Sequence, residues 1–168
     1  MKNEKFFFVS KKAAFTLIEL LVVFTIGAFL FGAGIASYGA FNKDKRLESH
    51  ARGIYELIES AKVKARSNDT GGCTSLSNYK ITVSGPRAVT IEAVCVTGTS
   101  SPYTYDIDSS DAVEIDTSVS SSTLSFYHLR STNDQGCIVL QDLKSLSCRN
   151  ISLSSSGVLT LQKNCSCS

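Results

Sequence analysis

The sequence lacks the residues and motifs on which most catalytic and metal sites depend. It contains two histidines, His50 and His128, and neither has a ligand spacing to a cysteine. No C-x-x-C pair is present, and Cys165-x-Cys167 alone is a weak pattern for zinc. The G-x-G-x-x-G, Walker, H-E-x-x-H and G-x-S-x-G motifs are missing as well. We therefore expect no enzyme activity, no catalytic residue, no metal and no cofactor.

An excess of charge of either sign is also missing. The chain of 168 residues has a formal charge of +2, but residues 1–14 hold four of its 17 Lys and Arg and one of its 15 Asp and Glu. Without that segment, 13 basic and 14 acidic residues remain. A nearly neutral protein has no broad electrostatic attraction for nucleic acid, which we do not expect as a partner.

Cysteine is missing from the first 72 residues and then occurs six times. An even number confined to one part of a chain is typical of disulfides formed in an oxidising compartment. Buried free thiols in a reducing compartment are the alternative. The six disulfide candidates are Cys73, Cys95, Cys137, Cys148, Cys165 and Cys167.

A short basic leader precedes a long apolar run. Residues 1–14 carry four lysines, and residues 15–36 form an apolar run with a single charge. As a helix this run would be about 33 Å long, enough to cross a hydrocarbon core of ~30 Å. The basic leader favours an orientation with the leader in the cytoplasm and the remainder outside.

Glu19 is the single charge within the apolar run. An ionised side chain inside a membrane costs roughly 2.5–3.5 kcal/mol on insertion scales. Such a charge usually has a partner, and a positive charge on a neighbouring copy of the chain is the natural candidate. Glu19 therefore suggests assembly.

Residues 11–23 read Lys-Lys-Ala-Ala-Phe-Thr-Leu-Ile-Glu-Leu-Leu-Val-Val. This segment resembles the cleavage and methylation motif of type IV prepilins and type II secretion pseudopilins. The resemblance implies that a membrane-bound prepilin peptidase cuts between Ala14 and Phe15 and methylates the new N-terminus at Phe15. Family members usually have Gly at the position of Ala14, which bears on the efficiency of processing. A plain signal anchor is the alternative.

The resemblance also implies a role for Glu19. Cleavage frees the amino group of Phe15, four residues before Glu19 and on about the same face of a helix. We expect Glu19 of one subunit to neutralise the N-terminal ammonium group of its neighbour during assembly.

Many pilins carry a proline within this helix, but Pro86 and Pro102 both lie elsewhere. Four glycines can make the helix flexible or can allow close contact between helices, and the sequence does not choose between these roles. They are Gly27, Gly32, Gly34 and Gly39.

Residues 42–67 have the periodicity of an amphipathic helix with one buried stripe. The stripe consists of Leu47, Ala51, Ile54, Ile58, Ala61 and Ala65. His50 lies among the charged residues beside it, and we interpret it as solvated. Asn68 to Gly72 are turn residues that end the helix.

Short segments rich in β-branched residues follow, separated by polar turns. The candidate strands are residues 79–83, 88–94, 103–107, 112–115, 123–127, 137–140, 150–153 and 158–162, the last two forming a closing hairpin. A helix followed by strands predicts an α+β fold with an antiparallel sheet packed on the helix, like that of type IV pilins.

The sequence does not fix how the cysteines pair. We expect Cys73 to pair with Cys95 and Cys137 with Cys148, leaving Cys165 and Cys167 to pair with each other or exchange partners. A separate cluster of acidic residues allows a calcium loop, although we favour a solvated loop. It comprises Asp106, Asp108, Asp111, Glu114 and Asp116.

These observations predict four segments. Residues 1–14 are a leader that is removed, and residues 15–37 are a transmembrane and filament-core helix. Residues 38–67 form an amphipathic helix, and residues 68–168 form a disulfide-stapled β-rich head.

The predicted function is that of a structural subunit of a type IV pilus or a type II secretion pseudopilus, most like a minor pilin or minor pseudopilin. Its partners are other pilin subunits, prepilin peptidase and the cytoplasmic membrane, with the head outside and later in an extracellular or periplasmic filament. A monomeric membrane-anchored binding or thiol-redox protein is the alternative.

Overall fold

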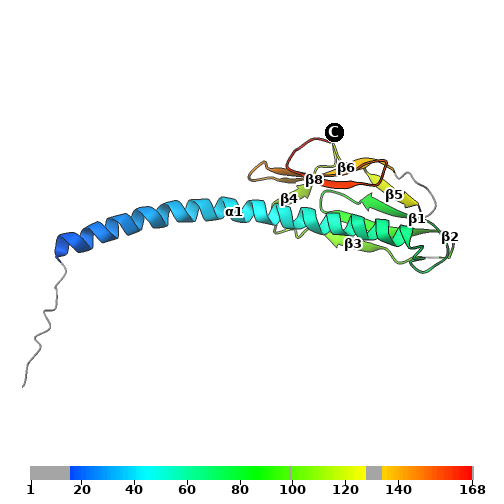
Figure 1. Cartoon of the computed structure of the whole chain (residues 1–168), viewed down its shortest axis with the longest axis horizontal. Coiled ribbons are helices and arrows are strands. Elements are labelled where there is room, and N and C mark those ends of the chain that lie inside the picture. Colours follow the sequence, from blue (N-terminus) through cyan, green and yellow to red (C-terminus); the bar gives the residue numbers. More distant parts are fainter. Residues whose placement is uncertain (1–15, 99, 128–133, 168) are drawn as a thin grey trace, which may run out of the picture. The chain divides into compact units, whose positions relative to one another are not determined.

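A computed structural model describes residues 16–98, 100–127 and 134–167, and gives only the backbone of residues 33–37 and 40. These residues form one helix followed by eight strands (Figure 1). The elements are α1 (Leu17–Arg66), β1 (Cys73–Val83), β2 (Ala88–Gly98), β3 (Tyr103–Asp106), β4 (Val113–Ile115), β5 (Thr123–Tyr127), β6 (Gly136–Asp142), β7 (Cys148–Leu153) and β8 (Leu159–Gln162). The predicted α+β class is confirmed.

The strands form two antiparallel sheets rather than one. The first sheet has the order β3-β2-β1-β5, and the second has the order β4-β6-β7-β8. Each of the eight segments predicted from the sequence overlaps one strand. The predicted closing hairpin is β7 and β8, in which Leu153 pairs with Leu159.

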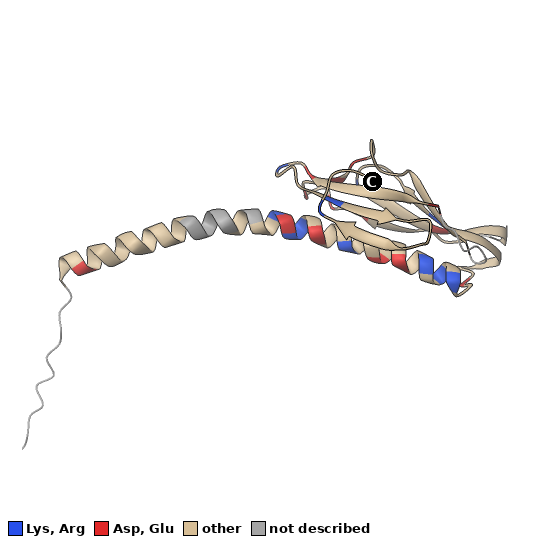
Figure 2. Ribbon diagram, turned by 45° about the horizontal axis from the view of Figure 1, so that its top comes forward, with Lys and Arg blue, Asp and Glu red and all other residues tan. Residues whose placement is uncertain are grey.

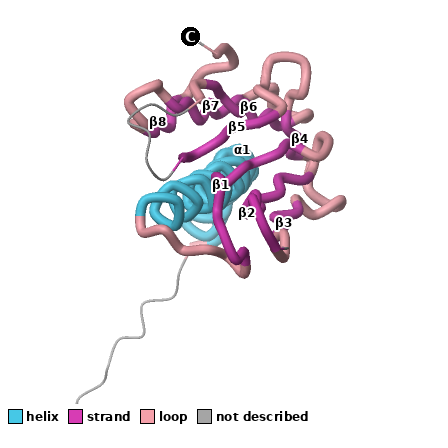
Figure 3. The backbone as a smooth tube through the Cα atoms, turned by 90° about the vertical axis from the view of Figure 1, so that its right-hand side faces the viewer, coloured by secondary structure: helices cyan, strands magenta, loops and turns pink. Residues whose placement is uncertain are grey.

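The second half of α1 packs against both sheets, which curve around it (Figure 3). The predicted stripe is confirmed, because all six of its residues are at most 1% exposed. They share one core with apolar residues from both sheets, such as Ile81 and Phe126 in the first sheet and Ile138 and Ile151 in the second. Burial of this stripe stabilises the helix against the head through the hydrophobic effect.

Gly53 lies within this packed part of α1. A Cβ atom at this position would lie 2.7 Å from the hydroxyl oxygen of Tyr105 and 2.8 Å from its Cε2. Glycine inside a helix is unfavourable by about 1 kcal/mol relative to alanine. Here glycine leaves room for the ring of Tyr105, which would have to shift if a Cβ were present.

The helix ends where the turn residues predict. Asn68 has a φ of 55°, and Gly71 and Gly72 also have positive φ values. The backbone N–H of Asp69 donates a hydrogen bond of 3.0 Å to the carbonyl oxygen of Lys64. A residue in the left-handed conformation just after the last turn is a common helix stop, and asparagine adopts it more easily than most residues.

The chain divides into two compact units, Met1–Gly39 and Ala40–Ser168. The first contains the beginning of α1. The second contains the rest of α1 and all eight strands, so the core described above belongs to it alone.

Candidate functional site

The first turn of α1 is capped by Thr16. The backbone N–H of Glu19 donates a hydrogen bond of 3.3 Å to the hydroxyl oxygen of Thr16. This is the N-cap arrangement, and Thr16-x-x-Glu19 has the sequence of a capping box. Glu19 therefore lies in the first helical turn, where the helix dipole favours a negative charge.

Ala14 and Phe15, the predicted sites of cleavage and methylation, lie outside the described residues. The leader, residues 1–14, lies outside them too. The pairing of Glu19 with an N-terminal amino group therefore stays a prediction.

Apolar side chains are exposed all around the first part of α1. They include Leu17, Ile18, Leu20, Leu21, Val22, Val23, Phe24, Ile26, Phe29, Leu30 and Phe31, of which Leu17 and Phe29 are more than 80% exposed. The hydroxyl of Thr25 donates to the carbonyl oxygen of Val22 at 2.8 Å, so its hydrogen bond is made within the helix. In Figure 2 this part of α1 carries a single acidic turn near its start.

No helix within the described residues is sufficiently long and apolar to span a bilayer.

Asp44 lies at the point where the packed part of α1 begins and joins it to the second sheet. Its carboxylate accepts hydrogen bonds from Arg149 in β7 and from Lys163, which follows β8. Arg149 is 4% exposed and Asp44 is 39% exposed, so a buried cation meets a half-exposed anion. The hydrogen bond from Arg149 lowers the pKa of the Asp44 carboxyl below its ordinary value of 3.8.

A second contact joins α1 to β3 and to the segment between β3 and β4. His50 Nε2 lies 2.9 Å from Asp111 Oδ2, and His50 Nδ1 lies 3.1 Å from the Tyr105 hydroxyl. Arg46 donates a hydrogen bond of 3.1 Å to the other oxygen of Asp111. The bonds with His50 and Arg46 lower the pKa of the Asp111 carboxyl. The interpretation of His50 as solvated is wrong, because its side chain is 16% exposed and bonded through both ring nitrogens.

The acidic cluster is organised by an arginine that sequence reasoning missed. Arg87 donates hydrogen bonds to the carbonyl oxygens of Asp108 and Asp111 at 2.9 and 3.0 Å, and to Glu114 Oε1 at 2.8 Å. Its guanidinium group thus supplies the positive charge that a bound cation would supply. Among the residues that the structure describes, no group of three or more acidic, histidine or cysteine side chains could hold a metal ion.

The six cysteines form three disulfides. Cys73 pairs with Cys95, which is the pair predicted, and their Cα atoms lie 5.3 Å apart. The predicted pairing of Cys137 with Cys148 is wrong. Cys137 instead pairs with Cys167, and Cys148 pairs with Cys165. Cys165 and Cys167 therefore do not form the C-x-C redox pair on which a thiol-redox protein would depend.

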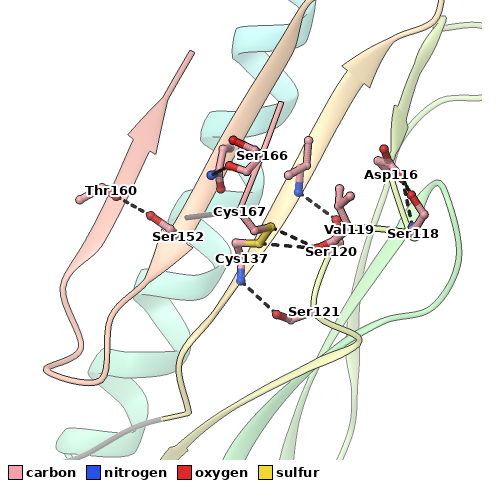
Figure 4. The surroundings of a disulfide bond; sticks show 12 residues. Asp116, Ser118, Val119, Ser120, Ser121, Cys137, Ser152, Thr160, Ser166 and Cys167 are labelled. Carbon is pink, nitrogen blue, oxygen red and sulfur yellow. Dashed lines mark hydrogen bonds between the residues drawn. A yellow bond between two sulfur atoms is a disulfide. The ribbon is translucent and has the colours of Figure 1, made fainter. Parts of the chain in front are cut away.

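The Cys137–Cys167 and Cys148–Cys165 bridges fix the segment after β8, residues 163–167, to the second sheet. We call this segment the tail. The Nδ2 of Asn150, a residue that is 1% exposed, donates a hydrogen bond to the carbonyl oxygen of Ser166. Figure 4 shows the Cys137–Cys167 bridge beside Val119 and Ser121, where the backbone N–H of Cys137 donates to the Ser121 hydroxyl at 3.1 Å. The tail thus covers a buried polar group.

A shallow groove with a volume of about 460 Å³ lies beside the Cys137–Cys167 bridge. Hydroxyl side chains line much of it, and two of them, Ser152 and Thr160, bond to each other at 2.7 Å. The hydroxyl of Ser121 is likewise bonded, so these groups are occupied with each other and with the backbone.

Residues 9–35 match the model of the prokaryotic N-terminal methylation motif. The matched segment contains Ala14, Phe15 and Glu19, and it extends over the first part of α1. Comparison with curated proteins and with solved structures found no match.

The chain therefore carries the type IV prepilin-like signature. The motif supports a precursor of the pilin and pseudopilin kind.

Proposed function

We propose that the chain is the precursor of a structural subunit of a type IV pilus or a type II secretion pseudopilus. The observation that carries this proposal is the methylation motif at residues 9–35, which continues into the apolar first part of α1. An apolar helical surface of this kind needs either lipid or other helices around it.

In this proposal the peptidase cuts between Ala14 and Phe15 and methylates Phe15. Residues 15–37 hold the subunit in the cytoplasmic membrane until it is polymerised, and then lie in the core of the filament. Residues 38–67 support the head, residues 68–168, on the outer side. The partners are other pilin subunits, of the same or of a different kind, and the subunit performs no catalysis.

Glu19 has two functions in this proposal. Within its own chain it lies at the third position of a capped helix, where a carboxylate is favoured. Between chains it neutralises the freed ammonium group of Phe15 of a neighbouring subunit. Removal of both charges from water is unfavourable unless they meet, so the pair specifies how two subunits align.

The test is to express the full chain together with a prepilin peptidase and to determine the N-terminus by sequencing and by intact mass. We expect the mature protein to begin at Phe15 and to carry one additional methyl group. Ala14→Gly should be processed faster, because Gly is the usual residue of the motif, and Ala14→Asp should not be processed. A protein that still begins at Met1 in the presence of an active peptidase would refute the proposal.

A further inference from the structure

The two bridges that hold the tail have a nested order. Along the chain the four cysteines are Cys137, Cys148, Cys165 and Cys167, and the first pairs with the last while the second pairs with the third. All six cysteines of the sequence are paired, so the folded protein has no free thiol.

The folded sheet prevents Cys137 from pairing with Cys148, the next cysteine along the chain. In the register of β6 and β7, Cys137 lies opposite Ser152, and Cys148 lies opposite Gln141. The two cysteines are therefore offset by four positions along adjacent strands, or about 13 Å at the usual rise of a strand. A disulfide needs Cα atoms within roughly 7 Å.

Before the sheet has formed, however, Cys137 is more easily joined to Cys148 than to Cys167. Cys137 and Cys148 are 11 positions apart, whereas the native partners Cys137 and Cys167 are 30 apart. The dependence of loop closure on length favours the shorter loop by about fivefold. If the head is exported with Cys73 first, which rests on the proposed function, Cys148 also reaches the oxidising side before Cys165. A dithiol oxidase then joins Cys137 to Cys148 and leaves Cys165 and Cys167 to each other.

A chain oxidised in this way contains no thiolate with which to correct itself. Disulfides exchange only through attack by a thiolate on a disulfide sulfur. We propose that this protein is a substrate of a thiol–disulfide isomerase, an enzyme with a reactive thiolate. The isomerase converts the neighbour pairs, Cys137–Cys148 and Cys165–Cys167, into the nested pairs. The nested pairs are Cys137–Cys167 and Cys148–Cys165.

The exchange is balanced and needs no net oxidant. The thiolate of the isomerase attacks Cys137 Sγ, forms a mixed disulfide and releases the Cys148 thiolate. That thiolate attacks Cys165 Sγ, forms the Cys148–Cys165 bridge and releases the Cys167 thiolate. The Cys167 thiolate attacks Cys137 Sγ in the mixed disulfide, which forms the Cys137–Cys167 bridge and restores the isomerase thiolate. Two disulfides are present before and after.

The structure gives the exchange a direction. Only in the nested form does the tail place the carbonyl oxygen of Ser166 at the buried amide of Asn150. Cys137 is then 5% exposed, with its Sγ against the carbonyl oxygen of Val119, whereas Cys165 and Cys167 are exposed. The direction therefore comes from the folded sheet, whose register keeps Cys137 and Cys148 too far apart for a bridge. When Cys137 is joined to Cys148 and Cys165 to Cys167, no bridge anchors the tail to β6 or β7.

The experiment starts from the full chain, reduced and unfolded, which is diluted into detergent micelles and oxidised with diamide. Peptide mass mapping without reduction then gives the pairs. Without a thiol we expect the Cys137–Cys167 bridge in about one fifth of the molecules or fewer. A catalytic amount of reduced protein disulfide isomerase should raise that fraction at least about fourfold.

Two double variants are matched controls. The first replaces Cys137 and Cys167 by serine, and the second replaces Cys148 and Cys165. In each variant four cysteines remain, and each native pair consists of cysteines that follow one another along the chain. Both should form those pairs without the isomerase. Mapping reads the bonds and not the folded state, so the result holds even where a variant is less stable.

Formation of the nested pairs by the natural chain without any thiol, at the rate of the control pairs, would overturn the proposal. So would recovery in glutathione alone as fast as with the isomerase, or no recovery with the isomerase. None of these measurements uses the prepilin peptidase or a filament, so failure of the proposed function would be seen separately, as an unprocessed N-terminus.

Discussion

The two parts of α1 have opposite relations to the rest of the chain. From Leu17 to Phe31 the apolar side chains surround the helix and are mostly exposed, whereas the six stripe residues between Leu47 and Ala65 are at most 1% exposed. Glycines differ in the same way. A Cβ at Gly27 or Gly32 would meet no atom within 4 Å, but a Cβ at Gly53 would collide with Tyr105. The second part is matched to its own head, whereas the apolar side chains of the first part remain exposed.

The largest effect is expected when the charge of Glu19, in the first part of α1, is removed. Glu19→Gln retains a side chain that suits a capping box but removes the charge, so we expect processing to be normal and incorporation into filaments to be abolished. Thr16→Ala is the control, because it removes the cap and keeps the charge, and it should still assemble. Filaments sheared from cells, together with the N-terminus of the cell-bound protein, give the two readouts. Normal assembly of Glu19→Gln would show that the charge has no such role.

Truncation of one apolar side chain in each part of the helix should separate their contributions to the head. Ile58 is fully buried, and Ile58→Ala should lower the free energy of unfolding by about 3 kcal/mol, since it loses apolar contacts and leaves a cavity. Ile26 is more than half exposed, and Ile26→Ala should leave the unfolding of the head unchanged. Denaturant unfolding in detergent, followed by tyrosine fluorescence, measures both. Equal effects would contradict the comparison.

The glycines provide a smaller test. Gly53→Ala should cost about 1–2 kcal/mol, because the clash with Tyr105 exceeds the gain in helix propensity. Gly27→Ala should be neutral for the head. Combining Gly53→Ala with Tyr105→Ala should remove the clash, so the two changes together should cost less than the sum of their separate effects. Additive effects in thermal unfolding would argue against the contact.

The smallest effect concerns the carboxylates that join α1 to the sheets. The folded-state pKa values of Asp44 and Asp111 are lowered by their partners. Their contribution to stability is therefore present above the ordinary value of 3.8 and is lost as the pH falls through the lowered value. Asp44→Asn should cost about 1 kcal/mol at pH 7, a modest figure because Asp44 is 39% exposed, and less near pH 3. Unfolding curves at both pH values measure the difference, and a cost that is equal at both would exclude this linkage.

The sequence was informative wherever one local pattern carried the answer. The stripe from Leu47 to Ala65 repeats at helical spacing, and the β-branched segments alternate, so the helix and all eight strands could be predicted. β1 was predicted to begin at Tyr79 but begins at Cys73. Its polar first residues form a strand because they pair with the end of β2, through an irregular register and the Cys73–Cys95 bridge.

Several contacts between distant segments could not be predicted. The pairing of Cys137 with Cys167 depends on the register of β6 and β7 and on the direction in which the tail leaves β8. Likewise, His50 looks like one more polar residue on a helix until β3 and the following loop bring Tyr105 and Asp111 beside it. The organising role of Arg87 had no sequence signal, because 21 to 27 positions separate it from the residues to which it donates hydrogen bonds.

Loss of the tail would leave recognisable defects in the folded protein. Cys165 and Cys167 follow every strand, so translation that stops early yields a protein with all its hairpins and neither closing bridge. Such a truncated product would leave the side-chain amide of Asn150 without the carbonyl oxygen that it bonds, and would leave two thiols unpaired. Those are features that proteases and thiol-dependent quality control can recognise.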